Sequence, residues 1–183
     1  MQRLLGVVLC GGRSSRMGRD KATLAHPEGG TFVSHAIERV RPLCEEVCIA
    51  GSFSSTVDVP VLEDPVAHEG PIVGILQALA FADQKGFAAC LVTPVDMPYL
   101  SSEDLERLQQ AWAMHQQLCC GREESNGQIQ PLVAVYPVSH AESLANHARN
   151  DRSLVEWLKT QTAIEVPLSP SACHNVNKPE DHL

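Results

Sequence analysis

No run of about 18 apolar residues, the length that a bilayer-spanning helix needs, occurs among these 183 residues. The first residues also lack the charged, apolar and small-residue succession of a signal peptide, so we expect a cytoplasmic protein with no membrane partner. Basic residues are outnumbered, since 14 Lys and Arg against 22 Asp and Glu give a formal net charge of -8. That balance disfavours nucleic acid as the main partner.

The seven cysteines show no C-x-x-C pair with a matching histidine cluster, which leaves a structural zinc site without support. Their number is odd, and Cys10, Cys48 and Cys90 fall in apolar runs. A chain of this length with 44% hydrophobic residues can fill one core without disulfides. We therefore expect reduced thiols in the core of a single domain over residues 1–183.

Two familiar phosphate-binding patterns are missing as well. The P-loop pattern G-x-x-x-x-G-K-[ST] fails because Gly18 is followed by Arg19 and Asp20. The dinucleotide fingerprint G-x-G-x-x-G fails because Gly11 and Gly12 are adjacent. A Walker-type NTPase and an enzyme that uses NAD or FAD are therefore both disfavoured.

A different glycine-rich loop is nevertheless present, directly after the apolar run 4–10. Glycine lacks a Cβ, so the backbone amides of this loop can approach an anion closely. Four cations stand within nine residues of an otherwise acidic chain, namely Arg13, Arg16, Arg19 and Lys21. A solvated surface turn is the simpler explanation, but this local concentration of positive charge favours a polyphosphate ligand.

Short apolar runs alternate with helical patterns along the chain, which is typical of an α/β fold. We predict a three-layer αβα arrangement around a mostly parallel, Rossmann-like sheet. Strands are expected at 4–10, 47–50, 59–62, 88–93, 118–120, 132–136 and 164–166, and helices at 32–43, from 71, from a capping box at Ser101 and Asp104, and at 139–149 and 153–160. The polar segment 122–130 is expected to be an excursion near the site, and 174–177 a short extended piece.

The apolar run 88–93 leads into Pro94-Val-Asp96-Met-Pro98, which puts a carboxylate at the carboxyl end of a buried strand. Ligands of open α/β sheets bind at this edge, where the Gly11 loop is also expected. A carboxylate repels a polyphosphate unless a cation lies between them, so Asp96 is predicted to be a Mg²⁺ ligand. The simpler explanation is that Asp96 caps a turn ahead of the helix that follows.

Two weaker motifs follow the same logic. Asp64 ends another short apolar run and could meet ribose hydroxyls or a base edge, although a plain turn residue explains it equally well. The sequence Gly70-Pro-Ile-Val-Gly74 offers a helix N-terminus against which a planar base could pack, and an ordinary helix start is again the simpler explanation.

Taken in order, these motifs resemble the nucleotidyltransferase family that makes molybdenum cofactor dinucleotides, and most closely the molybdenum cofactor guanylyltransferases. The motif Asn175-Val-Asn177-Lys-Pro-Glu-Asp181 favours the guanylyl branch. In the first motif, Cys10 stands where the family usually has alanine. The residues that carry the resemblance are Leu9-Cys-Gly-Gly-Arg-Ser-Ser-Arg-Met-Gly-Arg-Asp-Lys21, Glu63-Asp64, Gly70-Pro-Ile-Val-Gly74, Pro94-Val-Asp96-Met-Pro98, Gln130-Pro131 and Asn175-Val-Asn177-Lys-Pro-Glu-Asp181.

The resemblance implies that the terminal phosphate of molybdopterin attacks the α-phosphorus of GTP, giving a guanine dinucleotide cofactor and pyrophosphate with Mg²⁺ as cofactor. It also implies contacts with other proteins of cofactor biosynthesis or molybdoenzyme maturation. The implied roles are catalysis by Arg16, Lys21 and Asp96; nucleotide binding by Leu9, Cys10, Gly11, Gly12, Lys21, Asp64, Gly74 and Asp96; metal binding by Asp96; and molybdopterin binding by Asn175 and Asn177. A helix N-cap ahead of Pro179 is the simpler use of these asparagines.

One departure from the family bears on base selectivity. Ala50-Gly51 stands where family members often carry an asparagine at the end of the second strand. A cytidylyltransferase acting on the same cofactor therefore stays open as an alternative, as does a non-catalytic nucleotide-binding regulatory module. The pairing of Asp96 with Lys21 favours an enzyme over the module, and a sugar-phosphate nucleotidyltransferase would need a longer chain.

Overall fold

The computed structural model describes residues 3–11, 21–26, 29–53, 55–64 and 70–173. Seven strands form one sheet in the spatial order β3-β2-β1-β4-β6-β5-β7. Strand β6 is antiparallel to both of its neighbours, whereas the remaining pairs are parallel. The strands are β1 (Leu4–Cys10), β2 (Glu46–Gly51), β3 (Val61–Leu62), β4 (Ala89–Pro94), β5 (Cys119–Glu123), β6 (Ile129–Pro137) and β7 (Ile164–Leu168).

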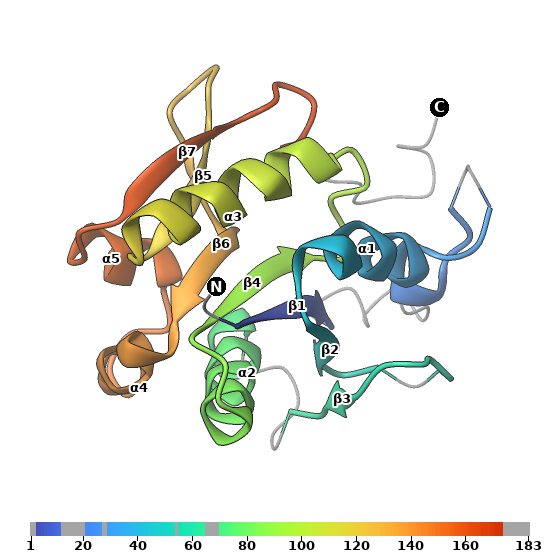
Figure 1. The fold of residues 1–183 in the computed structure, drawn as a ribbon, viewed down its shortest axis with the longest axis horizontal. Helices are drawn as coiled ribbons and strands as arrows, with labels where there is room; N and C mark the ends of the chain where they lie inside the picture. Colours follow the sequence, from blue (N-terminus) through green and yellow to red (C-terminus); the bar gives the residue numbers. More distant parts are fainter. Residues whose placement is uncertain (1–2, 12–20, 27–28, 54, 65–69, 174–183) are drawn as a thin grey trace.

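Helices cover both faces of this sheet (Figure 1). On one face lie α1 (Phe32–Val40) and α3 (Ser102–His115), and on the other α2 (Pro71–Lys85), α4 (Ala141–Ala148) and α5 (Leu154–Lys159). Alternate residues of β1 belong to the two cores, with Val8 facing the side of α1 and Val7 the side of α2. The predicted three-layer α/β fold with a mostly parallel sheet is therefore confirmed.

Local sequence signals explain where two of the helices begin. Thr31 caps α1 through a hydrogen bond from the Ser34 amide, and Ser101 caps α3 in the predicted capping box with Asp104. The described ranges also contain three short 3₁₀ turns: η2 (Lys21–Thr23), η3 (Arg41–Leu43) and η4 (Val138–His140). Helix α1 ends before Pro42, which cannot continue an α-helix, so the predicted helix over 32–43 is shorter than expected.

The predicted polar excursion over 122–130 was wrong in extent. Arg122 pairs with Ile129 and Gly121 with Gln130, so β5 and β6 extend into both ends of that segment and leave 124–128 between them. Strand pairing supplies the backbone hydrogen bonds that a long loop would leave to water. The polar side chains remain outside the core, as the ion pair of 3.1 Å between Arg122 Nε and Glu165 Oε2 illustrates.

The thiols are as the sequence predicts, since all seven cysteines are free. Burial raises the pKa of Cys48 to about 12, so this thiol stays protonated at neutral pH. Within the described ranges, no helix combines the length and the apolar character that crossing a bilayer requires.

Candidate active site

The carboxyl ends of β1 and β4 lie side by side in the middle of the sheet. Leu9 is in register with Pro94, and the Val95 amide donates a hydrogen bond of 3.1 Å to the Leu9 carbonyl oxygen. Gly11 and Asp96 each follow this pairing by two residues along parallel strands. The structure therefore brings the start of the glycine-rich loop and the proline-flanked carboxylate to the same edge of the sheet.

Asp96 lies in a turn between the end of β4 and the start of α3, and it is half-buried. The residues before and after it, Val95 and Met97, are buried, whereas Asp96 itself is partly exposed. A half-buried carboxylate keeps oxygen atoms within reach of a ligand. A partly exposed position suits a metal ligand better than a fully buried position does.

The end of β2 completes this edge through a close backbone contact. Gly51 has φ of +109°, and a Cβ at this position would lie 2.0 Å from the Cys10 carbonyl oxygen. Gly11 has φ of +93°, and a Cβ there would lie 3.2 Å from the Ser52 amide nitrogen. Glycine is therefore required at Gly51 on steric grounds. This requirement accounts for the glycine in the Ala50-Gly51 departure.

Asp64 lies against the same strand end. Its Oδ2 atom is 3.8 Å from the position that a Gly51 Cβ would take. The short strand β3 brings it there, because Leu62 pairs with Ala50 at the end of β2. The preceding residue is held from α2, where Gln77 Nε2 donates a hydrogen bond of 2.8 Å to the Glu63 carbonyl oxygen. The structure thus brings the second predicted acid to the glycine-lined edge.

Core packing accounts for the side chains of Leu9 and Cys10 and for the lack of one at Gly74. Leu9 and Cys10 are buried in the two opposite cores. Gly74 is buried on α2, where a Cβ would lie 3.4 Å from Leu9 Cδ2 and 3.6 Å from Ala50 Cβ. Leu9 and Cys10 can therefore offer a nucleotide only backbone groups. For Gly74, close packing of α2 on the sheet is an explanation that needs no ligand.

Comparison with known proteins identifies the family of this chain. Residues 6–165 match the family model of the MobA-like NTP transferase domain, so the match includes most of β1, Asp64 and Asp96. The chain belongs to this family. The glycine-lined edge of the sheet described above is the candidate site of this MobA-like NTP transferase domain.

Individual relatives agree with that family. The chain is 40% identical over 188 residues to a probable molybdenum cofactor guanylyltransferase of Rhodopirellula baltica, with 97% of this chain and 89% of that protein covered. Its fold is similar to molybdopterin-guanine dinucleotide biosynthesis protein A from Archaeoglobus fulgidus, with a TM-score of 0.75, 21% identity and coverage of 97% and 94%. It is also similar to Rv0371c of Mycobacterium tuberculosis in complex with manganese, with a TM-score of 0.71, 17% identity and coverage of 100% and 96%.

Several predicted site residues of this NTP transferase domain lie outside the described residues, namely Gly12, Arg16, Asn175 and Asn177. Lys21 is described by its backbone alone, as the first residue of η2. Their roles stay predictions. Of the predicted site residues, the structure describes Leu9, Cys10, Gly11, Asp64, Gly74 and Asp96 in full.

The side chains of this NTP transferase domain can be compared with the ligands that the predicted Mg²⁺ prefers. Among the described residues, no group of three or more His, Cys, Asp or Glu side chains gathers as a metal cage would. Magnesium is commonly held by one or two carboxylates, with phosphate and water oxygens filling the other positions. A single carboxylate at the rim, as at Asp96, fits that mode of binding.

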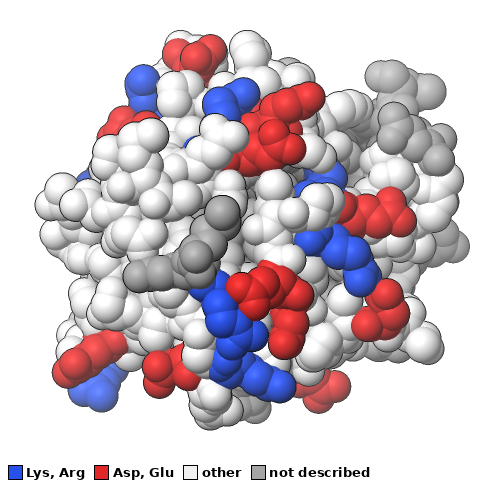
Figure 2. All heavy atoms as spheres, viewed as in Figure 1, with Lys and Arg blue, Asp and Glu red and all other residues white. Residues whose placement is uncertain are grey.

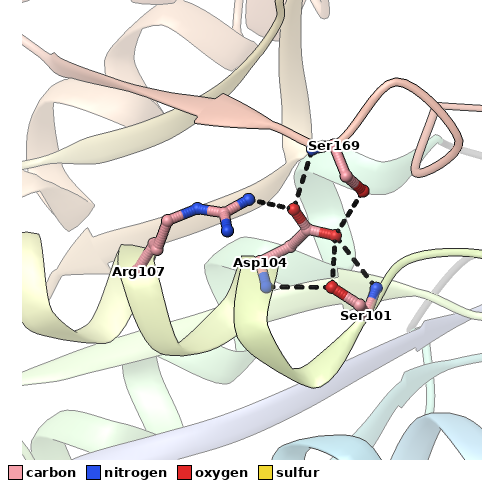
Figure 3. A network of polar contacts seen from close by, with 4 residues as sticks. All are labelled: Ser101, Asp104, Arg107 and Ser169. Carbon is pink, nitrogen blue, oxygen red and sulfur yellow. Dashed lines mark hydrogen bonds and ion pairs between the residues drawn. The ribbon is translucent and has the colours of Figure 1, made fainter.

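The sequence analysis missed a second role for Asp104, which is fully buried in the first turn of α3 (Figure 3). Beyond the capping box with Ser101, its carboxylate accepts hydrogen bonds from the Ser169 amide at 2.8 Å and the Ser169 hydroxyl at 2.9 Å, and pairs with Arg107. Burial by itself raises the pKa of Asp104, but the hydrogen bonds from Ser101 and Ser169 outweigh it and lower the pKa. The capping-box pattern predicted the contact of Asp104 with Ser101. No sequence pattern predicted the contact with Ser169, which lies 65 residues away.

Proposed function

We propose that this chain transfers GMP from GTP to the terminal phosphate of molybdopterin, through one nucleotidyltransferase domain over residues 1–183. An oxygen of the molybdopterin phosphate forms a bond to the α-phosphorus, the bond from that phosphorus to the β-phosphate oxygen breaks, and pyrophosphate leaves with the electron pair. The observation that carries the proposal is the meeting of Gly11 and Asp96 at one edge of the sheet, in a chain 40% identical to a probable molybdenum cofactor guanylyltransferase.

The attacking group is an already ionised phosphate, so this reaction needs no strong general base. Catalysis can rest on orienting the two substrates and neutralising the charge on the phosphates. The backbone of residues 9–12 would contact the nucleotide, and Asp64 would meet its ribose or base. Arg16 and Lys21 would bring positive charge to the α-phosphate and to the pyrophosphate, and Asn175 and Asn177 would hold the molybdopterin.

Asp96 would hold a divalent ion, which we propose to be Mg²⁺. When bound, this ion supplies positive charge that offsets the repulsion between the Asp96 carboxylate and the triphosphate. The half-buried position of Asp96 supports this role, as does the manganese named for the similar Mycobacterium tuberculosis structure. The seven free thiols support work in the reducing cytoplasm.

Calorimetric titration with GTP, CTP and ATP in the presence of Mg²⁺ tests the nucleotide directly. We expect GTP to bind at least about tenfold more tightly than CTP, which corresponds to about 1.4 kcal/mol of binding free energy. Preference for CTP would instead support a cytidylyltransferase acting on the same cofactor. A parallel assay with molybdopterin and GTP should release pyrophosphate; nucleotide binding without pyrophosphate release would support a non-catalytic regulatory module.

A further inference from the structure

Arg39, in the last turn of α1, contacts the chain that follows Asp96. Its Nη1 atom lies 3.0 Å from the Met97 carbonyl oxygen and 3.2 Å from the Pro98 carbonyl oxygen, and it also donates to the Leu100 carbonyl oxygen. One guanidinium nitrogen thus binds three main-chain oxygens within four residues. All of these oxygens belong to the turn that joins β4 to α3.

This use of an arginine differs from others in the molecule. Figure 2 shows Lys and Arg side chains next to Asp and Glu on the surface, and two such ion pairs are Arg3 with Glu45 at 2.7 Å and Arg41 with Asp58 at 2.9 Å. Exposed pairs of this kind contribute little to stability. Arg39 is half-buried instead, and its guanidinium binds three backbone carbonyl oxygens, whereas the exposed Arg3 binds one, that of Lys85.

Holding the guanidinium there has an energetic cost. Burial lowers the pKa of Arg39, which reflects the partial loss of its hydration. Its Nε atom is buried, and the described part of the chain offers it no hydrogen-bond acceptor. Simple packing would be served as well by an apolar side chain. The hydrogen bonds to the turn are what an arginine provides at this position and an apolar side chain does not.

The two neighbours of Asp96 show what these contacts hold in place. On one side, the Val95 amide is hydrogen-bonded to the Leu9 carbonyl oxygen of β1. On the other side, the Met97 carbonyl oxygen is hydrogen-bonded to Arg39 of α1. The Asp96 backbone is therefore fixed immediately before and after the residue, and the direction of its carboxylate depends on both attachments.

We propose that Arg39 is a positioning residue, which holds the turn after β4 so that the Asp96 carboxylate faces its divalent ion. The inference rests on the proposed function, because it assumes that Asp96 binds the metal. Residues that orient a metal ligand typically change metal affinity by about 10- to 100-fold when they are replaced. Arg39 would act in this way through the backbone, without touching either substrate.

The test compares Arg39→Met and Arg39→Lys with a matched control, Arg41→Met. Methionine keeps much of the apolar volume and removes every donor, whereas lysine keeps the charge on a group of different shape. Arg41 is two residues further along and pairs with Asp58 at the exposed surface, so its loss removes an arginine without touching the turn. All measurements are made well below the melting temperature of each variant.

Two readouts do not depend on turnover. Titration of Mn²⁺ in the presence of GTP, followed by electron paramagnetic resonance, should show at least about tenfold weaker metal binding in Arg39→Met. Amide hydrogen exchange over residues 95–101 should be faster in the same variant. Arg39→Lys should lie between Arg39→Met and wild type, and Arg41→Met should match wild type in both measurements.

The inference is overturned if hydrogen exchange accelerates while Mn²⁺ affinity stays within twofold of wild type, because Arg39 would then serve the fold alone. Unchanged hydrogen exchange in Arg39→Met would overturn it as well. Should Arg39→Met fail to fold, Arg39→Lys carries the test, with at least threefold weaker Mn²⁺ binding expected and wild-type binding contradicting the inference. Failure of the proposed function is distinguishable, because it appears in wild type as absent GMP transfer.

Discussion

Two aspartates eight residues apart, one on each side of the start of α3, have opposite environments. Asp104 is fully buried, and its carboxylate is surrounded by donors from Ser101, Arg107 and Ser169. Asp96 is half-buried in the turn at the edge of the sheet. A carboxylate whose oxygens are all engaged within the fold stabilises the fold, whereas one at the rim keeps oxygens for a ligand.

The same contrast extends to the two halves of the sheet. In the half formed by β1, β2 and β4, parallel strands end together at Gly11, Gly51 and the turn of Asp96. In the other half, the antiparallel strand β6 reverses the chain direction. In this second half, β6 lies between β4 and the parallel pair of β5 and β7, so three neighbouring carboxyl ends meet only in the first half, which is the better candidate for a site.

The largest expected effect follows from replacing the carboxylate at the rim. Asp96→Asn keeps the size of the side chain and removes its charge, so GMP transfer should fall by about 10³-fold while the melting temperature stays within about 2 °C. The rate of pyrophosphate release at saturating GTP and Mg²⁺ measures the first, and thermal denaturation the second. Unchanged turnover would remove Asp96 from the site.

Asp104→Ala should show the reverse behaviour. Its removal leaves buried donors of Ser101 and Ser169 without an acceptor, so the free energy of unfolding should fall by about 3 kcal/mol. Urea denaturation measures this loss. At a temperature where the variant is folded, its transfer rate should remain within a few fold of wild type. A large loss of turnover with normal stability would erase the distinction between the two aspartates.

Much of the half of the sheet formed by β1, β2 and β4 could be predicted from the sequence. Its strands are continuous apolar runs because both faces are covered, and the glycines and acid that follow them mark the edge where parallel strands end. The capping box at Ser101 and Asp104 was equally predictable, because both partners lie within one helical turn. Local patterns of this kind need no knowledge of the tertiary fold.

Contacts between distant segments could not be predicted in this way. Ser169 reaches Asp104 only because β7 ends beside the start of α3, and Arg39 reaches the Asp96 turn only because α1 and α3 share one face of the sheet. The extent of the β5–β6 hairpin was missed for a related reason. Its ends are polar, and it is pairing with the neighbouring strand, not burial, that makes them strands.

Alanine substitutions at Gly51 and Gly74 should distinguish the glycine-lined edge of the sheet from the packing of α2 against the sheet. Gly51→Ala places a Cβ against the Cys10 carbonyl oxygen in a backbone conformation that alanine disfavours, so it should destabilise the fold by about 2 kcal/mol and weaken GTP binding. Gly74→Ala is the matched control, because its Cβ would meet Leu9 at an ordinary 3.4 Å. Urea denaturation and GTP titration of both variants check this. Weaker GTP binding in Gly74→Ala alone would favour a nucleotide contact at Gly74.

The smallest expected effect is the pH dependence of the stability that Asp104 contributes. The hydrogen bonds that lower its pKa exist only in the folded state, so the unfolded chain binds the proton more readily. The contribution of Asp104 is therefore fully present above its unfolded pKa and is lost as the pH falls below about 4, towards the folded pKa. Urea denaturation of wild type and Asp104→Asn between pH 7 and pH 3 isolates this contribution, because all other side chains are common to both proteins. The difference in unfolding free energy should narrow towards pH 3, and a constant difference would mean that the Asp104 carboxylate titrates alike in the folded and unfolded chain.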